Sequence, residues 1–206
     1  MLELESIKPA WVGLVEIVQR LEEQPYHWPV GRTTFQRIAY VATEEGLPTG
    51  VRYQKGSYGP FSPDLKSLVA RLINNGLIRE EKLGRMLAVK VGPTFKDAQK
   101  AYSDELKKWD PIIEKTADLF MRLNSNQAEV VATVLYAAKL VEETRAEQLS
   151  EKDVLDAVMQ WKQRRRPPLN EPETALAIRN LAALNWLKVK PSHDLPLPEE
   201  KVLQME

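Results

Sequence analysis

The stretch "KGSYGPFSPDL", residues 55–65, restricts the backbone more than any other part of this 206-residue chain. It combines two glycines and two prolines, and a serine directly precedes the second proline. Ser62 has a typical N-cap side chain, and Pro63 suits the first helical position because its missing N–H is not needed there. The stretch therefore predicts a rigid turn that leads into a helix. The structural residues of this turn are expected to be Gly56, Gly59, Pro60, Ser62 and Pro63.

The helix expected over residues 63–75 has one strongly apolar face, because its leucines, valine and isoleucine recur at helical spacing. Gly76 is well placed to end this helix. Residues 77–92 then have the pattern of two short strands joined near Leu83 and Gly84. This pattern predicts a β-hairpin.

Two more helices are expected before the turn, over residues 10–22 and 34–45, and a short strand over 50–55. Thr33 or Thr34 can cap the second of these helices. Three helices followed by a hairpin is the element order of a winged helix, whose third helix is the usual recognition element. The first part of the chain is therefore expected to be winged-helix-like.

From residue 94 onward the sequence predicts helices. The first covers about 95–109, and Asp110–Pro111 either kinks it or restarts it as far as 123. The caps or starts of three further helices are expected at Asn126 with Glu129, at Ser150 with Asp153, and at Pro172.

Residues 68–80 and 178–190 share a pattern, in which an amphipathic helix runs through Asn into a Leu-rich, strand-like segment. Two tandem winged-helix-like halves would explain this similarity, and so would chance. The expected fold class is α+β and mostly α. The expected parts are a winged-helix-like domain at 1–92, a helical domain at 93–190 and an extended tail at 191–206.

Charge is unevenly distributed along a chain whose formal net charge is zero. Residues 51–100 hold ten basic and four acidic side chains, whereas 1–50 and 101–150 each have an acidic excess of three. A basic block can attract nucleic acid or an acidic protein surface, or can simply be a solvated face. The candidate partner- or DNA-binding residues are Lys55, Tyr58, Phe61, Lys66, Arg71, Asn74, Arg79, Lys82, Arg85, Arg164 and Arg165.

Residue content argues against several kinds of chemistry. Cysteine is absent and the two histidines, His27 and His193, lie far apart, so neither a disulfide nor a zinc site is expected. No apolar run approaches the roughly 18 residues of a membrane span, and a reducing cytoplasm is the expected location.

No catalytic pattern stands out either. "GSYG" (56–59) has the spacing of a KH-domain loop but is closed by Pro60 and follows a strand candidate. His27 lies between Tyr26 and Trp28 and is interpreted as a packed loop residue rather than a general base. The chain is therefore not expected to be an enzyme or to need a cofactor.

The stretches 34–46 and 53–78 resemble two related groups of bacterial antitoxins. One is the C-terminal domain of the DarG-type antitoxins, with a K-G-P-Y-G-P-Y pattern after a Q-K-L-A-Y helix. The other is the SocA-like, or Panacea, domain, with a Y-G-P-[YF]-S-P-x-L pattern. Residues 58–63 and Leu65 match the second pattern throughout. The first is matched by Lys55, Gly56, Tyr58, Gly59 and Pro60, and Ser57 and Phe61 depart from it.

The later half of the chain is more similar to the DarG-type group. "AEVVATVLYAA", "VMQWKQRRR" and "LAALNWL" follow that domain's order of a buried helix, a W-x-x-R/K segment and a terminal G-W-L, with Asn185 in place of the glycine. The resemblance implies a non-enzymatic domain that binds and neutralises a partner DNA ADP-ribosyltransferase toxin. The chain lacks the macrodomain of those antitoxins, so it is either part of a longer protein or a standalone relative.

The sequence therefore leaves two alternative functions. In the first, the chain occupies the DNA-binding cleft of a toxin, and the acidic segments 1–50 and 101–150 supply mimics of phosphate. In the second, the chain is a winged-helix transcriptional regulator that binds DNA through helix 63–75 and the hairpin. The sequence specifies neither the toxin or operator nor the oligomeric state.

Overall fold

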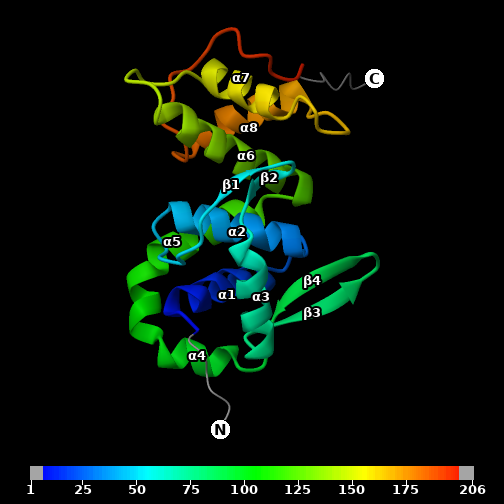
Figure 1. Ribbon diagram of the computed structural model, residues 1–206, viewed down its shortest axis with the longest axis vertical. Helices are drawn as coiled ribbons and strands as arrows, with labels where there is room; N and C mark the ends of the chain where they lie inside the picture. The colour runs from blue at the N-terminus through cyan, green and yellow to red at the C-terminus, as the bar shows by residue number, and fades with distance from the viewer. Residues whose placement is uncertain (1–6, 200–206) are drawn as a thin grey trace, which may run out of the picture. The chain divides into compact units, whose positions relative to one another are not determined.

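The computed structural model describes residues 7–199 and has an α+β fold (Figure 1). Within this range there are eight helices and two antiparallel two-stranded sheets. The chain divides into two compact units: unit 1 comprises 1–56 and 60–129, and unit 2 comprises 57–59 and 130–206. None of the helices between residues 7 and 199 is both long and apolar enough to span a membrane.

The core of unit 1 is built on α1 (Pro9–Glu22), most of which is buried. Helices α2 (Arg32–Glu44), α4 (Phe95–Ala101) and α5 (Ser103–Met121) pack against it. The indole of Trp11 donates a hydrogen bond of 2.9 Å to the carbonyl of Thr49, which fixes the chain that follows α2. Helix α1 is therefore the central element of unit 1.

The N-cap of helix α2 lies two or three residues before the predicted cap, Thr33 or Thr34. Gly31 is the N-cap, and Thr34 lies buried inside the helix rather than at its end. The cause is a long-range contact, because Gly31 bridges to Ala88 and Val30 accepts a 2.7 Å hydrogen bond from the N–H of Val89. This pairing holds the chain extended up to Gly31, and the helix starts immediately afterwards.

The Gly- and Pro-rich stretch forms β1 (Gln54–Gly56) and β2 (Gly59–Phe61), followed by α3 (Asp64–Asn74). The strand predicted over 50–55 is thus shorter and lies later. Pro63, rather than Ser62, is the residue preceding α3, but the Ser62 hydroxyl still accepts the N–H of Asp64 at 3.3 Å. Gly59 has φ = +116°, which explains why this position holds glycine.

The end of α3 and the hairpin agree with the sequence. Gly76 has φ = +69°, and the N–H groups of Gly76 and Leu77 donate to the carbonyls of Ile73 and Leu72, both at 2.9 Å. Strands β3 (Ile78–Leu83) and β4 (Met86–Val91) then pair antiparallel around a tight turn containing Gly84, which also has a positive φ. The hairpin extends beyond the helices of unit 1 (Figure 1).

The helix predicted over 95–109 is broken at Tyr102, and not at Asp110–Pro111. Pro111 lies inside α5, so the proline removes one N–H without ending the helix. Packing of α5 along α1 and α2 supports it there. Because this packing places α4 and α5 in unit 1, that unit extends well past residue 92, where the sequence placed the domain boundary.

Helix α6 (Ser125–Glu142) begins in unit 1 and continues in unit 2. Its N-terminal cap lies two residues before the predicted pair: Asn124 and Gln127 exchange side-chain to backbone hydrogen bonds, each 2.9 Å long. Glu129, the predicted cap partner, is instead buried and lies 3.8 Å from Arg37. A buried cation of unit 1 therefore engages the carboxylate that the sequence assigned to capping.

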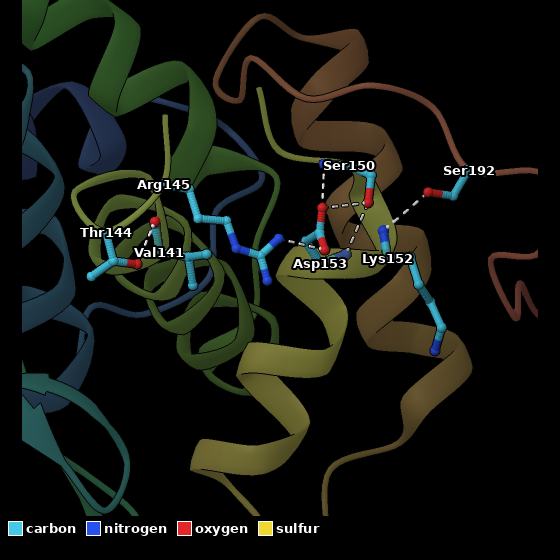
Figure 2. Close-up of polar contacts among 7 residues, drawn as sticks. All are labelled: Val141, Thr144, Arg145, Ser150, Lys152, Asp153 and Ser192. Atoms are coloured by element: carbon cyan, nitrogen blue, oxygen red, sulfur yellow. Dashed lines mark hydrogen bonds and ion pairs between the residues drawn. The ribbon is translucent and has the colours of Figure 1, made fainter. Parts of the chain in front are cut away.

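Unit 2 also contains α7 (Glu151–Trp161) and α8 (Glu171–Ala183). The predicted capping box of α7 is present, with Ser150 and Asp153 each bonding the other's backbone N–H (Figure 2). Helix α8 is capped by Asn170, so Pro172 occupies its second position rather than its first. These caps fix the starts of both helices.

The similarity between 68–80 and 178–190 has a structural counterpart in the helix ends. Asn185 has φ = +61°, and the N–H of Trp186 donates to Leu181 at 2.8 Å, which is the capping geometry of Gly76 and Leu77. The segment after α8 does not form a hairpin within the described residues. Instead Lys190 bridges in parallel to Ser150.

The predicted tail has no regular secondary structure over 191–199 but is anchored to unit 2. Ser192 donates its N–H to Glu151 at 2.8 Å, and Leu195 is buried. Glu151 is itself buried and accepts two hydrogen bonds from Arg179. These hydrogen bonds are the main reason that the pKa of Glu151 is lowered. The remainder of the predicted tail, 200–206, lies outside the described residues.

Candidate interaction surfaces

The outer face of α3 presents the side chains that the sequence selected. Lys66, Arg71 and Asn74 are exposed, whereas Leu65, Leu68 and Leu72 on the opposite face are buried in unit 1. The Arg71 guanidinium lies 5.9 Å from the centroid of the Trp11 ring, so its charge is partly held against the protein. Helix α3 therefore offers a polar, mildly basic face.

The hairpin is less basic than its sequence suggests, because carboxylates engage two of the nearby guanidinium groups. Arg79 lies 3.1 Å from Glu81 on the same strand. Arg32 makes two hydrogen bonds of 2.6 Å to Glu80, which lower the pKa of that carboxyl. Lys82 and Arg85 are exposed near the hairpin turn.

Unit 1 also exposes several large apolar side chains, which the sequence reasoning did not select except for Phe61. Tyr26 is 91% exposed and Trp28 is 58% exposed, and both lie in the segment between α1 and α2. The segment is held in place, because His27 Nδ1 lies 2.9 Å from the Gln24 carbonyl oxygen. On the hairpin, Leu83 and Leu87 are exposed as well.

In unit 2 the tip of the β1–β2 turn packs beside the end of α7. Lys162 is buried, and its Nζ donates to the carbonyl of Ser57 at 2.7 Å. The Arg165 guanidinium lies 6.0 Å from the ring centroid of Tyr58, which remains 62% exposed. Two motifs that are far apart in the sequence thus meet within one unit.

The other residues near this turn are arranged more simply. Arg164 is exposed, and Arg165 also donates to the carbonyl of Pro167. Lys55 on β1 is exposed, whereas Pro60 and Ser62 are buried. The structure therefore separates the predicted contact residues into a set in unit 1 and a set in unit 2, and Lys162 is a positioning residue that the sequence did not reveal.

The two acidic segments of the sequence meet in unit 1. Glu23 at the end of α1 and Glu114 and Asp118 on α5 line one cleft of about 340 Å³. The sequence indicated these three carboxylates only through the net acidic charge of the segments 1–50 and 101–150. Among the residues that the structure describes, no group of three or more acidic or histidine side chains is arranged to hold a metal ion.

Comparison with known proteins gives a match to a bacterial protein. No family model matches the chain. An uncharacterized protein of Bacillus subtilis strain 168, YwgA, is 26% identical over 127 residues, which cover 58% of this chain and 72% of that protein. The chain is therefore similar to a bacterial protein whose name states no activity.

Proposed function

We propose that this chain is a non-enzymatic, antitoxin-type domain that binds and neutralises a partner DNA ADP-ribosyltransferase toxin. The resemblance of the loop and helix motifs to DarG-type and SocA-like domains supports the class of partner. In this proposal the chain acts in the cytoplasm, needs no cofactor and does not engage a membrane. Inhibition follows from occupying the toxin, not from reversing its product.

The observation that carries the proposal is the exposure of aromatic side chains on unit 1. Tyr and Trp are enriched among the residues that dominate protein–protein binding energy, and large apolar side chains exposed close together can mark a site of protein interaction. Tyr26 and Trp28 meet this description. A protein partner accounts for them better than the phosphate backbone of duplex DNA, which is contacted mainly through cations and hydrogen-bond donors.

We further propose that α1, α2, α3 and the β3–β4 hairpin form a winged-helix-like module. The pairing of residues 30–31 with β4 supports this, because one bridge and one hydrogen bond hold the segment before α2 against the hairpin. The acidic side chains gathered from 1–50 and 101–150 then act as the mimics of phosphate toward the toxin's DNA-binding cleft.

The alternative function is a winged-helix regulator that binds DNA. The exposure of Lys66, Asn74, Lys82 and Arg85 favours it, because these side chains could reach phosphates or base edges from α3 and the wing. The pairing of Arg79 with Glu81 weighs only slightly against it, because both side chains are exposed and such a pair contributes little.

The test is a titration of the chain against the ADP-ribosyltransferase encoded by the neighbouring gene. We expect inhibition that saturates near one chain per toxin and requires no cofactor. In parallel, the chain is incubated with DNA that has already been ADP-ribosylated, and we expect the modification to remain. Removal of the modification would show an enzyme, and absence of a complex at micromolar concentration would favour the DNA-binding regulator.

A further inference from the structure

The cleft of unit 1 lies between the last turn of α1 and the second half of α5. Three apolar side chains, Leu21, Ala117 and Met121, contribute to its lining. Its volume of about 340 Å³ is near the lower limit of roughly 300 Å³ for pockets that hold small molecules. The cleft therefore has room for one long side chain with its flanking backbone, but not for a large cofactor.

The charged groups of the cleft are mostly carboxylates. Glu23, Glu114 and Asp118 line it, against a single guanidinium, that of Arg20. That cation is already engaged, because Arg20 pairs with Asp110 and lies 3.5 Å from Glu16.

Two of the carboxylates make only weak interactions with other side chains of the chain. Asp118 pairs with Arg122 at 3.0 Å, but both side chains are more than half exposed, so this pair contributes little. Glu23 accepts a hydrogen bond from the neutral amide of Gln19 at 2.9 Å. The cleft lining thus combines unbalanced negative charge with apolar side chains.

The exposed aromatic side chains adjoin this cleft in the chain. Gln24 belongs to the lining, and the next residues lead directly to Tyr26 and Trp28. Aromatic rings attract cations through their faces, and an arginine or lysine has an apolar stem as well as a charged head. The apolar lining residues, the carboxylates and the rings would each contact a different part of such a side chain.

We propose that this cleft and the aromatic turn at 25–28 bind a basic segment of a partner protein, with one arginine or lysine side chain seated in the cleft. The inference rests on the proposed function and deepens it, because it assigns the surface and the chemistry of the partner. Phosphate groups are excluded as the occupant of the cleft itself, since its carboxylates repel them. The partner segment is therefore cationic.

A peptide titration tests the cleft without the toxin. The probe is tetra-arginine, the control is tetra-glutamine, and the signal is the methyl resonance of Met121, assigned from a Met121→Leu variant. We expect this resonance to shift and saturate with tetra-arginine but not with tetra-glutamine. An unmoved Met121 resonance would overturn the inference.

Matched variants show whether the carboxylates are responsible. The cleft pair is Glu114→Gln with Asp118→Asn, and the control pair is Asp97→Asn with Asp104→Asn, which changes the net charge equally at positions outside the cleft lining. We expect the cleft pair to bind tetra-arginine about tenfold more weakly and the control pair to bind it as the wild type does. If both pairs of substitutions weakened tetra-arginine binding equally, the effect would come from net charge, and the proposed binding in the cleft would be wrong.

The same variants separate this inference from the proposed function. If the wild-type chain forms no complex with the toxin, the proposed function fails, while the peptide titration still decides whether the cleft binds cations. If the toxin binds the wild type and the cleft pair with equal affinity, the proposed function stands and this inference is wrong. We expect the cleft pair to bind the toxin at least about tenfold more weakly than the control pair.

Discussion

Replacement of Asp153 by alanine should remove the N-terminal cap of α7 and destabilise unit 2. The carboxylate accepts hydrogen bonds from the Ser150 N–H at 2.9 Å and the Ser150 hydroxyl at 2.7 Å, and from Arg145 at 2.8 Å (Figure 2). The bond from the Ser150 N–H is the main reason that the pKa of Asp153 is held at about 2, below its ordinary value of 3.8. The ionised carboxylate is therefore favoured in the folded chain.

The size of the effect follows from this pKa. One pKa unit corresponds to about 1.4 kcal/mol, so the fall from 3.8 to about 2 corresponds to about 2.5 kcal/mol in favour of the folded state. The Asp153 side chain is 32% exposed, and solvent screening reduces this to about 1 kcal/mol. Loss of a helix cap typically costs a similar amount, about 1 kcal/mol. We therefore expect Asp153→Ala to lower the free energy of unfolding by about 1 kcal/mol at pH 7.

The pH dependence has a defined sign. A carboxyl whose folded-state pKa is depressed stabilises the fold above its unfolded-state pKa, and this contribution is lost as pH falls through the folded-state pKa. The difference between wild type and Asp153→Ala should thus be complete above about pH 5 and should shrink toward pH 2. Urea unfolding at several pH values measures it.

A matched control is Asp156→Ala on the same helix. Asp156 is 63% exposed and pairs only with Lys152 four residues earlier among the described contacts, so its loss should cost no more than about 0.5 kcal/mol. Equal effects of the two substitutions, or a difference between wild type and Asp153→Ala that persists unchanged at pH 2, would refute the reasoning.

Four further outcomes are expected. Gly59→Ala should cost about 1–3 kcal/mol in urea unfolding, because φ is +116° and the new methyl would lie 3.3 Å from the Thr133 hydroxyl, whereas Ser62→Ala should cost about 0.5–2 kcal/mol. Lys162→Met keeps the apolar stem but leaves the Ser57 carbonyl without its charged donor, so unfolding should become easier by about 1–3 kcal/mol. Duplex DNA binding should be weak. A DNA-binding regulator would make about six phosphate contacts, so a tight affinity that falls with salt at a log–log slope of roughly −5 would support that alternative instead.

Local patterns were sufficient to predict the elements that local interactions determine. The C-terminal end of α3 and the start of α7 depend on hydrogen bonds that span a few residues, and Gly76, Ser150 and Asp153 were identified correctly. The hairpin turn at Gly84 is equally local. In each case the residue type and the backbone geometry leave one favourable arrangement.

The predictions that differ from the structure depend on contacts between distant parts of the chain. The start of α2 follows from the pairing of Gly31 with Ala88, and the different role of Glu129 follows from Arg37. The extent of unit 1 depends on α5 packing against α1, about ninety residues earlier, which no periodicity within α5 reveals. The candidate contact residues on α3 are exposed, as the sequence predicted. The pairing of Arg32 with Glu80 on the hairpin joins distant parts of the chain and could not be predicted from local sequence.

The two motifs that carry the resemblance have a packing role in common, and this bears on where a partner binds. The Y-G-P-F motif and the W-K-x-R-R motif were separate signals in the sequence, yet Lys162 holds Ser57 and Arg165 lies beside Tyr58. These contacts within unit 2 give part of each motif a packing role, so the motifs do not by themselves mark a binding surface. A partner should instead contact side chains that the folded unit leaves in solvent. Tyr26, two residues after Gln24 of the cleft lining, is the most exposed large apolar example among residues 7–199.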